Sequence, residues 1–316
     1  MRNAVVAMLF ACAALFAQRP SNPALMVPQT APELDYVSVA NPFTLPEGTT
    51  MGPPASTAFD SKGHMYVLNR GPQALMEFDA NGKFIRAFGE GLFRRTHGFR
   101  IDRDDNLWMT DVGAHIVVKM NPQGQVLLTL GTKGEAGDWD EATQSHHFNE
   151  PNDVITGRNG DIFVVQGHTA GKGDPRVFKF DKDSKFIKSW GGQGTEPGKF
   201  TVAHGIAIDA KGLLWVTDRE NQRIEIFDQD GKFIRELKYA GLPCGVAIGD
   251  QYIYMVNGFA GQLLRLDLNG NVLAAVGKSG KGLGEFGEAH FVTLSPKGEV
   301  WVADTVNSSL QKFVKK

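Results

Sequence analysis

Six copies of one pattern divide most of the chain, and this repeat constrains the fold more than any other feature. Each copy has a short apolar segment, a turn and a second apolar segment, as in THGFRIDRDDNLWMTD and AHGIAIDAKGLLWVTD. The copies begin near Pro54, Thr96, Pro151, Ala203, Pro243 and Ala289. Five of them add a third segment, a polar hairpin turn and a fourth segment, as in IEIFDQDGKFIREL. Four short strands every 40 to 55 residues, without a helical period, predict an all-β fold, a six-bladed β-propeller.

The two ends of the repeat predict how the ring closes. The sixth copy stops at its third strand, residues 310–313, whereas residues 34–39 form an additional strand before the first copy. Pairing this N-terminal strand with the last blade would close the ring and remove two open edges. We therefore expect one propeller domain over residues 34–316. Two sandwich domains, the alternative for a chain of this length, would leave the regular repeat unexplained.

An export signal is predicted for residues 1–17. A weakly positive start precedes the apolar run Ala4–Ala17, which is too short to span a bilayer comfortably. Cleavage near Ala17 is favoured over a lipoprotein box at Cys12, which would leave a very short apolar region. Residues 18–33 contain four prolines and no periodicity, which predicts a disordered leader. The mature chain is then periplasmic or secreted, and Cys244 has no partner for an internal disulfide.

Charge and turn chemistry exclude several classes of function. Thirty-three basic and 35 acidic side chains give a net charge of −2, so no nucleic-acid partner is expected. The mature chain offers no transmembrane segment. Acidic turns such as residues 79–82 and 228–231 look like fragments of calcium loops, but they lack the closing glutamate. They are interpreted as hairpin turns.

Three histidines occupy equivalent positions in alternate copies of the repeat. The start of each innermost strand lies near a propeller's axis, and in one register these positions are Ala55, His97, Asn152, His204, Cys244 and His290. Alternate blades are about 120° apart, so three imidazoles can converge on one point. Three neutral imidazoles with an open fourth position are typical of catalytic zinc. Histidines that merely suit a half-wet channel are the alternative, but the strict alternation favours a metal.

Several longer phrases carry a resemblance to a known family. They are HGFRIDRDDNLWMTDVGAHIVVKMNPQGQVLLTLG from His97, HFNEPNDV from His147 and TDREN from Thr217. In these phrases the chain resembles the peptidyl-α-hydroxyglycine α-amidating lyases, six-bladed propellers of the NHL-repeat type. The resemblance covers roughly residues 67–313. The repeat is shared by many binding propellers, whereas the alternate-blade histidines together with these phrases are more specific.

The resemblance implies a zinc-dependent lyase that splits a C-terminal α-hydroxyglycine into a peptide amide and glyoxylate. Zinc would be bound by the three histidines of the ring. Arg70, in the segment LNRG, falls where the family has an arginine that holds the substrate near the metal. A guanidinium suits a carboxylate or oxyanion, and zinc acidifies a bound hydroxyl. Without the resemblance, Arg70 would be interpreted as a surface cation near a blade edge.

The chain departs from the family at three positions. The family's general base is a tyrosine in an Asp-Gly-Tyr turn, where this chain has Gln-Gly-His168. His168 is expected to accept the proton instead, or else it marks a relative that has lost or changed the reaction. Glu288 replaces a methionine two residues before the third histidine. Phe291 replaces an aspartate that, in the family, helps to bind a structural calcium ion. This replacement argues against calcium in this chain. A remaining calcium ligand would be a backbone carbonyl, such as that of Phe99.

Other polar residues near these motifs have structural interpretations. Asp111, Asp218 and Asp304 recur after the second strand of their copies, and such a repeat more often orders a turn. His115 matches the family without a necessary catalytic role. Asp153, next to the ring position Asn152, is a spare carboxylate that could support a ligand.

Three classes of function remain open. The first is the metal lyase, acting on the C-terminus of a peptide or on a related small N-acyl hemiaminal. The second is a non-catalytic exported propeller with a protein or glycan partner. The third is a calcium lactonase, which would require carboxylates around the axis, and the ring contains none. The lyase is favoured because it alone uses both an open metal position and a nearby proton acceptor.

Overall fold

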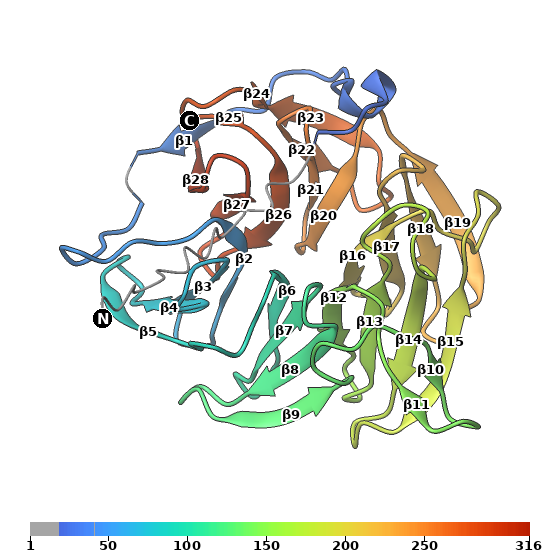
Figure 1. The fold of residues 1–316 in the computed structure, drawn as a ribbon. Coiled ribbons are helices and arrows are strands. Elements are labelled where there is room, and N and C mark those ends of the chain that lie inside the picture. The colour runs from blue at the N-terminus through green and yellow to red at the C-terminus, as the bar shows by residue number, and fades with distance from the viewer. Residues whose placement is uncertain (1–18, 41) are drawn as a thin grey trace, which may run out of the picture.

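The computed structural model describes residues 19–40 and 42–316, which contain six four-stranded sheets arranged around a central axis (Figure 1). The predicted all-β, six-bladed propeller is therefore confirmed. The predictions of a signal at residues 1–17 and of a lipid anchor at Cys12 fall outside the described residues. Within the described part of the chain, no helix has the length and hydropathy needed to cross a membrane.

Each blade is a meander of neighbouring strands. Blade 1 contains β2 (Pro54–Phe59), β3 (Met65–Asn69), β4 (Leu75–Phe78) and β5 (Phe84–Phe88). Blade 2 contains β6 (Thr96–Ile101), β7 (Leu107–Asp111), β8 (Ile116–Met120) and β9 (Val126–Leu130). Blade 3 contains β12 (Pro151–Thr156), β13 (Ile162–Gln166), β14 (Arg176–Phe180) and β15 (Phe186–Gly191).

The second half of the ring repeats this arrangement. Blade 4 contains β16 (Ala203–Ile208), β17 (Leu214–Asp218), β18 (Arg223–Phe227) and β19 (Phe233–Lys238). Blade 5 contains β20 (Pro243–Ile248), β21 (Ile253–Asn257), β22 (Gln262–Leu266) and β23 (Val272–Val276). Blade 6 contains β26 (Ala289–Leu294), β27 (Val300–Asp304), β28 (Ser309–Lys315) and β1 (Tyr36–Val39). Outside the blades lie the short pairs β10 (Trp139–Asp140) with β11 (Ser145–His146) and β24 (Lys278–Ser279) with β25 (Glu285–Phe286), and the 3₁₀ helix η1 (Pro23–Met26).

Burial explains why these segments form strands. The second strand of every blade is buried throughout, as in β3 and β17, whereas the fourth strands consist mostly of half-buried and exposed residues, as in β5 and β19. Side chains of neighbouring blades fill the space between the sheets, as where Met65 and Val67 of blade 1 pack with Trp301 of blade 6. The core is thus distributed between the blades, and it leaves the axis to the inner strands.

The predicted closure of the ring is also confirmed. Strand β1 pairs antiparallel with β28, from Tyr36 opposite Lys315 to Val39 opposite Lys312. The order of the last sheet is β1-β28-β27-β26, so both ends of the repeat share one blade. This pairing covers the outer edge of β28 and joins blade 6 to the start of the domain.

The segment before β1 differs from the disordered leader that its composition predicts. The backbone amide of Gln29 donates to Oε1 of Gln262 at 2.7 Å, and Oε1 of Gln29 accepts from the amide of Ala240 at 2.9 Å. Leu25 of η1 is buried against Leu242 and Phe259 of blade 5. Four prolines do exclude a long regular element here, but they do not prevent these contacts with a distant blade.

Candidate metal centre

A β-bulge near the start of each inner strand aims one side chain at the axis. In every blade the register between the first and second strands shifts there, as between Ala203 and Gly205 in β16. A bulge leaves a residue out of the ladder and re-orients its side chain. The residues released in this way include the six predicted ring positions Ala55, His97, Asn152, His204, Cys244 and His290.

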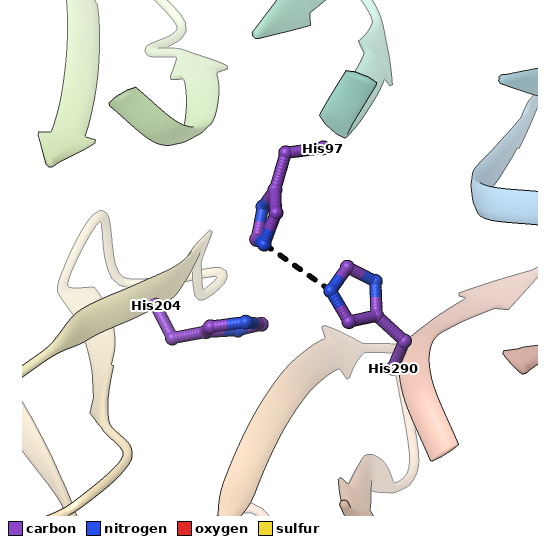
Figure 2. Close-up of side chains that lie close together, drawn as sticks. All are labelled: His97, His204 and His290. Atoms are coloured by element: carbon purple, nitrogen blue, oxygen red, sulfur yellow. Dashed lines mark hydrogen bonds between the residues drawn. The ribbon is translucent and has the colours of Figure 1, made fainter. Parts of the chain in front are cut away.

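The three histidines of the ring converge on one point (Figure 2). All three are buried, and one ring nitrogen of each lies within 4.8 Å of the other two. The Nε2 atoms of His97 and His290 are 3.2 Å apart. Nε2 of His204 is buried without a hydrogen-bond partner. The sequence therefore predicted correctly that these three side chains meet and can form a metal site.

The other nitrogen of each imidazole is fixed by the neighbouring blade. Each Nδ1 lies within hydrogen-bond distance of a backbone carbonyl: His97 with Asn152 at 2.7 Å, His204 with Cys244 at 3.0 Å and His290 with Ala55 at 2.8 Å. A carbonyl only accepts, so Nδ1 donates and, in a neutral imidazole, Nε2 carries a lone pair. The even blades thus supply imidazoles, and the odd blades supply the carbonyls that orient them.

Three lone pairs that face one another are a suitable set of ligands for a metal ion. Burial lowers the pKa of all three imidazoles well below the ordinary value, and neighbouring imidazoles or arginines lower it further. Neutral Nε2 atoms 3.2 Å apart repel each other, and a shared cation removes this repulsion. Histidine that donates its second nitrogen to a carbonyl is the usual form of a metal ligand. The donor set therefore fits a divalent metal such as zinc.

Two threonines that the sequence interpretation missed support this geometry. Oγ1 of Thr110 donates to the carbonyl of Asn152 at 2.8 Å and accepts from the amide of Gly98. Oγ1 of Thr217 makes the equivalent bonds to the carbonyl of Cys244 and the amide of Gly205. The Thr-Asp dipeptide that ends the second strand in blades 2 and 4 is the sequence feature that could have identified these threonines. Blade 6 has Ala303 at this position and lacks the hydroxyl.

The aspartates after these residues order the loops that precede the inner strands. Asp111 accepts from the backbone amides of Arg94 and Arg95, and Asp304 from those of Gly287 and Glu288. This confirms the structural interpretation of the repeated aspartate. His115 likewise accepts from a backbone amide through Nδ1, at 3.1 Å from Glu150.

A cavity of about 280 Å³ reaches the metal centre at His290. Three arginines line it, Arg70, Arg95 and Arg219, together with Glu288 and Glu220. Burial and the like charge of Arg95 lower the pKa of Arg70 to about 10, so Arg70 stays protonated at neutral pH. Arg219 lies at the same repeat position as Arg70, directly after the second strand, and this equivalence could have identified it from sequence.

His168 and Arg70, the two residues predicted to act on a substrate, both line this cavity with His290. The His168 ring lies edge-on to His97, with 4.8 Å between the centroids. Burial lowers its pKa well below the ordinary value, and Arg219, Arg95 and Arg70 lower it further. His168 is therefore neutral near pH 7, which is the form that accepts a proton.

On the other side of the histidines, the residues do not fit calcium. The Phe291 ring lies 4.9 to 5.5 Å from the three imidazoles. The carbonyl of Phe99, the expected remaining ligand, accepts from Nη1 of Arg100 at 3.0 Å. Asp153 pairs with the same guanidinium at 2.6 Å. Asp153 is thus not a spare carboxylate, because Arg100 neutralises it.

The N-terminal segment forms the outer wall of the cavity. Pro20, Ser21, Asn22 and Leu25 line it together with Leu242 and Phe259. No local sequence pattern indicates this contact, because the N-terminal segment and the metal centre are far apart along the chain.

Known proteins resemble this chain in sequence and in fold. Residues 200–227 and 286–313 match the NHL repeat. The chain is 31% identical over 279 residues to mouse peptidyl-glycine alpha-amidating monooxygenase, across 81% of this chain and 27% of that protein. It is 36% identical over 149 residues to a probable peptidyl-alpha-hydroxyglycine alpha-amidating lyase of Caenorhabditis elegans, across 46% of this chain and 40% of that one. The chain is thus homologous to proteins that bear the name of amidating lyases, at 28% to 36% identity.

The chain corresponds to only part of each of these relatives. It spans about a quarter of the mouse protein, and 52% of a Drosophila melanogaster peptidyl-alpha-hydroxyglycine alpha-amidating lyase to which it is 28% identical over 82% of its own length. Among solved structures, a streptogramin B lyase superposes with a TM-score of 0.63 at 17% identity, covering 89% of this chain and 97% of that one. A gluconolactonase of Xanthomonas campestris gives 0.62 at 14% identity, over 83% and 86%. At these identities the likeness concerns the fold alone.

Proposed function

We propose that the chain is an exported metal-dependent lyase that cleaves peptidyl-α-hydroxyglycine, or a related N-acyl hemiaminal, to an amide and glyoxylate. One observation carries the proposal: three imidazole nitrogens face one another, and one of these histidines, His290, lines a cavity together with three arginines. Homology to amidating lyases supports the reaction type.

The arginines suit the carboxylate of the substrate. Arg70, Arg95 and Arg219 surround the same small cavity, and Nε of Arg95 is buried without a partner. Guanidinium groups bind carboxylates through two parallel hydrogen bonds. Nε of Arg70 donates to the carbonyl of Thr96 at 3.2 Å. This hydrogen bond restricts the orientation of the guanidinium and leaves its other N–H groups available to a ligand. This arrangement would hold the glycine carboxylate beside the histidines.

His168 would act as the proton acceptor. The hydroxyl proton of the substrate passes to the neutral imidazole, the C–N bond breaks as the C=O bond of glyoxylate forms, and the amide nitrogen takes up one proton. Burial lowers the pKa of His168, and the positive charge of the arginines lowers it further. An incoming carboxylate would offset this charge and raise the proton affinity of the imidazole. Binding of the anionic substrate would therefore prepare the base.

His97, His204 and His290 would hold the metal, which we propose to be zinc, through Nε2. When bound, such an ion acts as a Lewis acid that makes a substrate hydroxyl more acidic. The chain's own contribution is to keep the three imidazoles neutral and fixed by the carbonyls of the next blades.

We also propose that the protein is exported and that it does not bind nucleic acid. Residues 1–17 would direct the chain to the periplasm or the medium, and a lipid on Cys12 would instead anchor it. The intact mass of the purified mature protein distinguishes cleavage near Ala17 from lipidation. The partner expected in the cavity is a small molecule or the C-terminus of a peptide.

Glyoxylate release tests the reaction. Zinc-loaded mature protein is given N-benzoyl-α-hydroxyglycine, beside the variants His204→Ala and His147→Ala. His147 lies in a loop outside the cavity and serves as the control. We expect metal-dependent release by the wild type and by His147→Ala, and none above background by His204→Ala. Folded, zinc-loaded wild type that releases no glyoxylate would refute the lyase and favour the non-catalytic binding propeller.

A further inference from the structure

The guanidinium of Arg100 connects the inner strands directly behind the three histidines. Nη1 donates to the carbonyl of Phe99 in blade 2 at 3.0 Å. Nη2 donates to Oδ2 of Asp153 in blade 3 at 2.6 Å and to the carbonyl of Ile206 in blade 4 at 3.1 Å. The guanidinium carbon lies 5.5 Å from the centroid of the Phe291 ring in blade 6. One side chain thus contacts four of the six blades.

Every partner of Arg100 is a near neighbour of a residue that forms the metal centre. Asp153 follows Asn152, whose carbonyl orients His97. Ile206 is two residues after His204, and its amide donates to Oδ2 of Asp153 at 3.1 Å. Phe291 follows His290, and its ring contacts all three imidazoles. Displacing the guanidinium would therefore change the relative positions of the strands that carry the ligands.

The oxygens around this guanidinium are those that a hard cation would select. Two backbone carbonyls and one carboxylate, from three different blades, converge on a space that is mostly closed to solvent, since Arg100 is 18% and Asp153 0% exposed. Calcium takes such oxygen ligands. A planar guanidinium can satisfy the same set, because its donors point in several fixed directions within one plane.

We propose that Arg100 serves as a built-in cation on the axis, replacing a second metal ion and positioning the strands that hold the histidines. The chain then binds one metal ion, at the histidines, and has no use for calcium. Arg100 is a positioning residue in this scheme, because it reaches the metal only through the strands. The proposal does not depend on the lyase reaction.

Metal binding by the folded protein tests this role. The affinity for Zn²⁺ is measured by competition with a chelator, and the visible spectrum of the Co²⁺-substituted protein reports the ligand geometry. The variants are Arg100→Lys, which keeps the charge but loses the planar fork, and Arg103→Lys, an exposed control three residues further on. We expect Arg100→Lys to weaken Zn²⁺ binding by about 10- to 100-fold and to alter the Co²⁺ spectrum, and Arg103→Lys to change neither.

Calcium supplies the second arm of the experiment. Metal analysis of the wild type with excess CaCl₂ should give one transition-metal ion and no calcium per chain, and the Tm should not move. A bound calcium ion with a raised Tm would overturn the proposal, as would wild-type Zn²⁺ affinity and Co²⁺ spectrum in Arg100→Lys. If Arg100→Lys does not fold, Asp153→Asn takes its place with the same expectations, since it removes the carboxylate partner and preserves the shape.

Discussion

Blades 2, 4 and 6 differ from blades 1, 3 and 5 in the side chain at the ring position, although the strands that carry it share the same bulge. All six inner strands carry the bulge that aims a residue at the axis. In the even blades this residue is histidine, whereas in the odd blades it is Ala55, Asn152 or Cys244. The bulge is therefore a property of the fold, whereas the candidate metal centre depends on the three histidine side chains that the even blades place at this bulge.

The odd blades nevertheless take part through their backbone. The carbonyls of Ala55, Asn152 and Cys244 accept from the histidines of the preceding blades. A carbonyl is present whatever the side chain, so the odd positions are free to differ. The even blades therefore determine which ligand side chains are present, and the odd blades determine which nitrogen of each imidazole faces the candidate metal site.

The largest effect is expected when the ring residue is replaced by alanine in one even blade and, separately, in one odd blade. We expect His204→Ala to weaken Zn²⁺ binding by about 1,000-fold or more, because two imidazoles cannot complete the site. Cys244→Ala should leave the affinity within about threefold, since its carbonyl remains. Chelator competition measures both constants. Loss of binding in Cys244→Ala would mean that an odd blade supplies a ligand after all.

His168 belongs to an odd blade, and it separates catalysis from metal binding. We expect His168→Ala to lower the rate of glyoxylate release by about 100- to 10,000-fold with unchanged metal content. His168→Tyr restores a proton acceptor and should recover part of this loss. Steady-state kinetics combined with metal analysis decides the matter. Equal rates for wild type and His168→Ala would remove His168 from the reaction.

A buried carboxylate distinguishes blade 4 from most other blades. Glu225 occupies the position held by Met76, Val118, Phe178 and Leu264 in blades 1, 2, 3 and 5. Burial raises its pKa from 4.5 to about 7. A raised pKa means that the folded protein binds a proton that the unfolded chain has released, so the free energy of unfolding falls as pH rises from about 4.5 to about 7.

Glu225→Gln should remove this penalty. At pH 7.5 we expect the variant to gain up to about 3 kcal/mol in the free energy of unfolding, and at pH 4 to gain little. Urea denaturation at both pH values provides the measurement, with the exposed Glu90→Gln as control. A gain of the same size at both pH values would contradict the assignment to Glu225 ionisation.

The smallest effect is expected at the threonines that only two of the even blades possess. Thr217→Val keeps the shape but leaves the amide of Gly205 without its acceptor. We expect a loss of about 1 to 2 kcal/mol in the free energy of unfolding and a Zn²⁺ affinity about tenfold weaker. Denaturation and chelator competition provide the two values. Blade 6 has Ala303 at this position and therefore lacks the hydroxyl. A wild-type Zn²⁺ affinity in Thr217→Val would show that the carbonyl alone orients the histidine.

The sequence determined the repeat, and with it the blades, the closure by residues 36–39 and the register that brings His97, His204 and His290 together. These features follow from periodic burial and from short turns, which are encoded locally and repeated six times. The resemblance to a known family points to Arg70 and His168, and the tertiary structure shows that Arg95 and Arg219 line the same cavity. Which nitrogen of each histidine faces inward was decided only by the tertiary structure, since the acceptor for His290 lies 235 residues away. The contacts of Arg100 were likewise decided only by the tertiary structure, because its partners in blades 3, 4 and 6 are too distant along the chain for a local sequence pattern to indicate them. Side-chain direction and contacts between blades depend on how the ring closes, and this is why they appear only in the folded molecule.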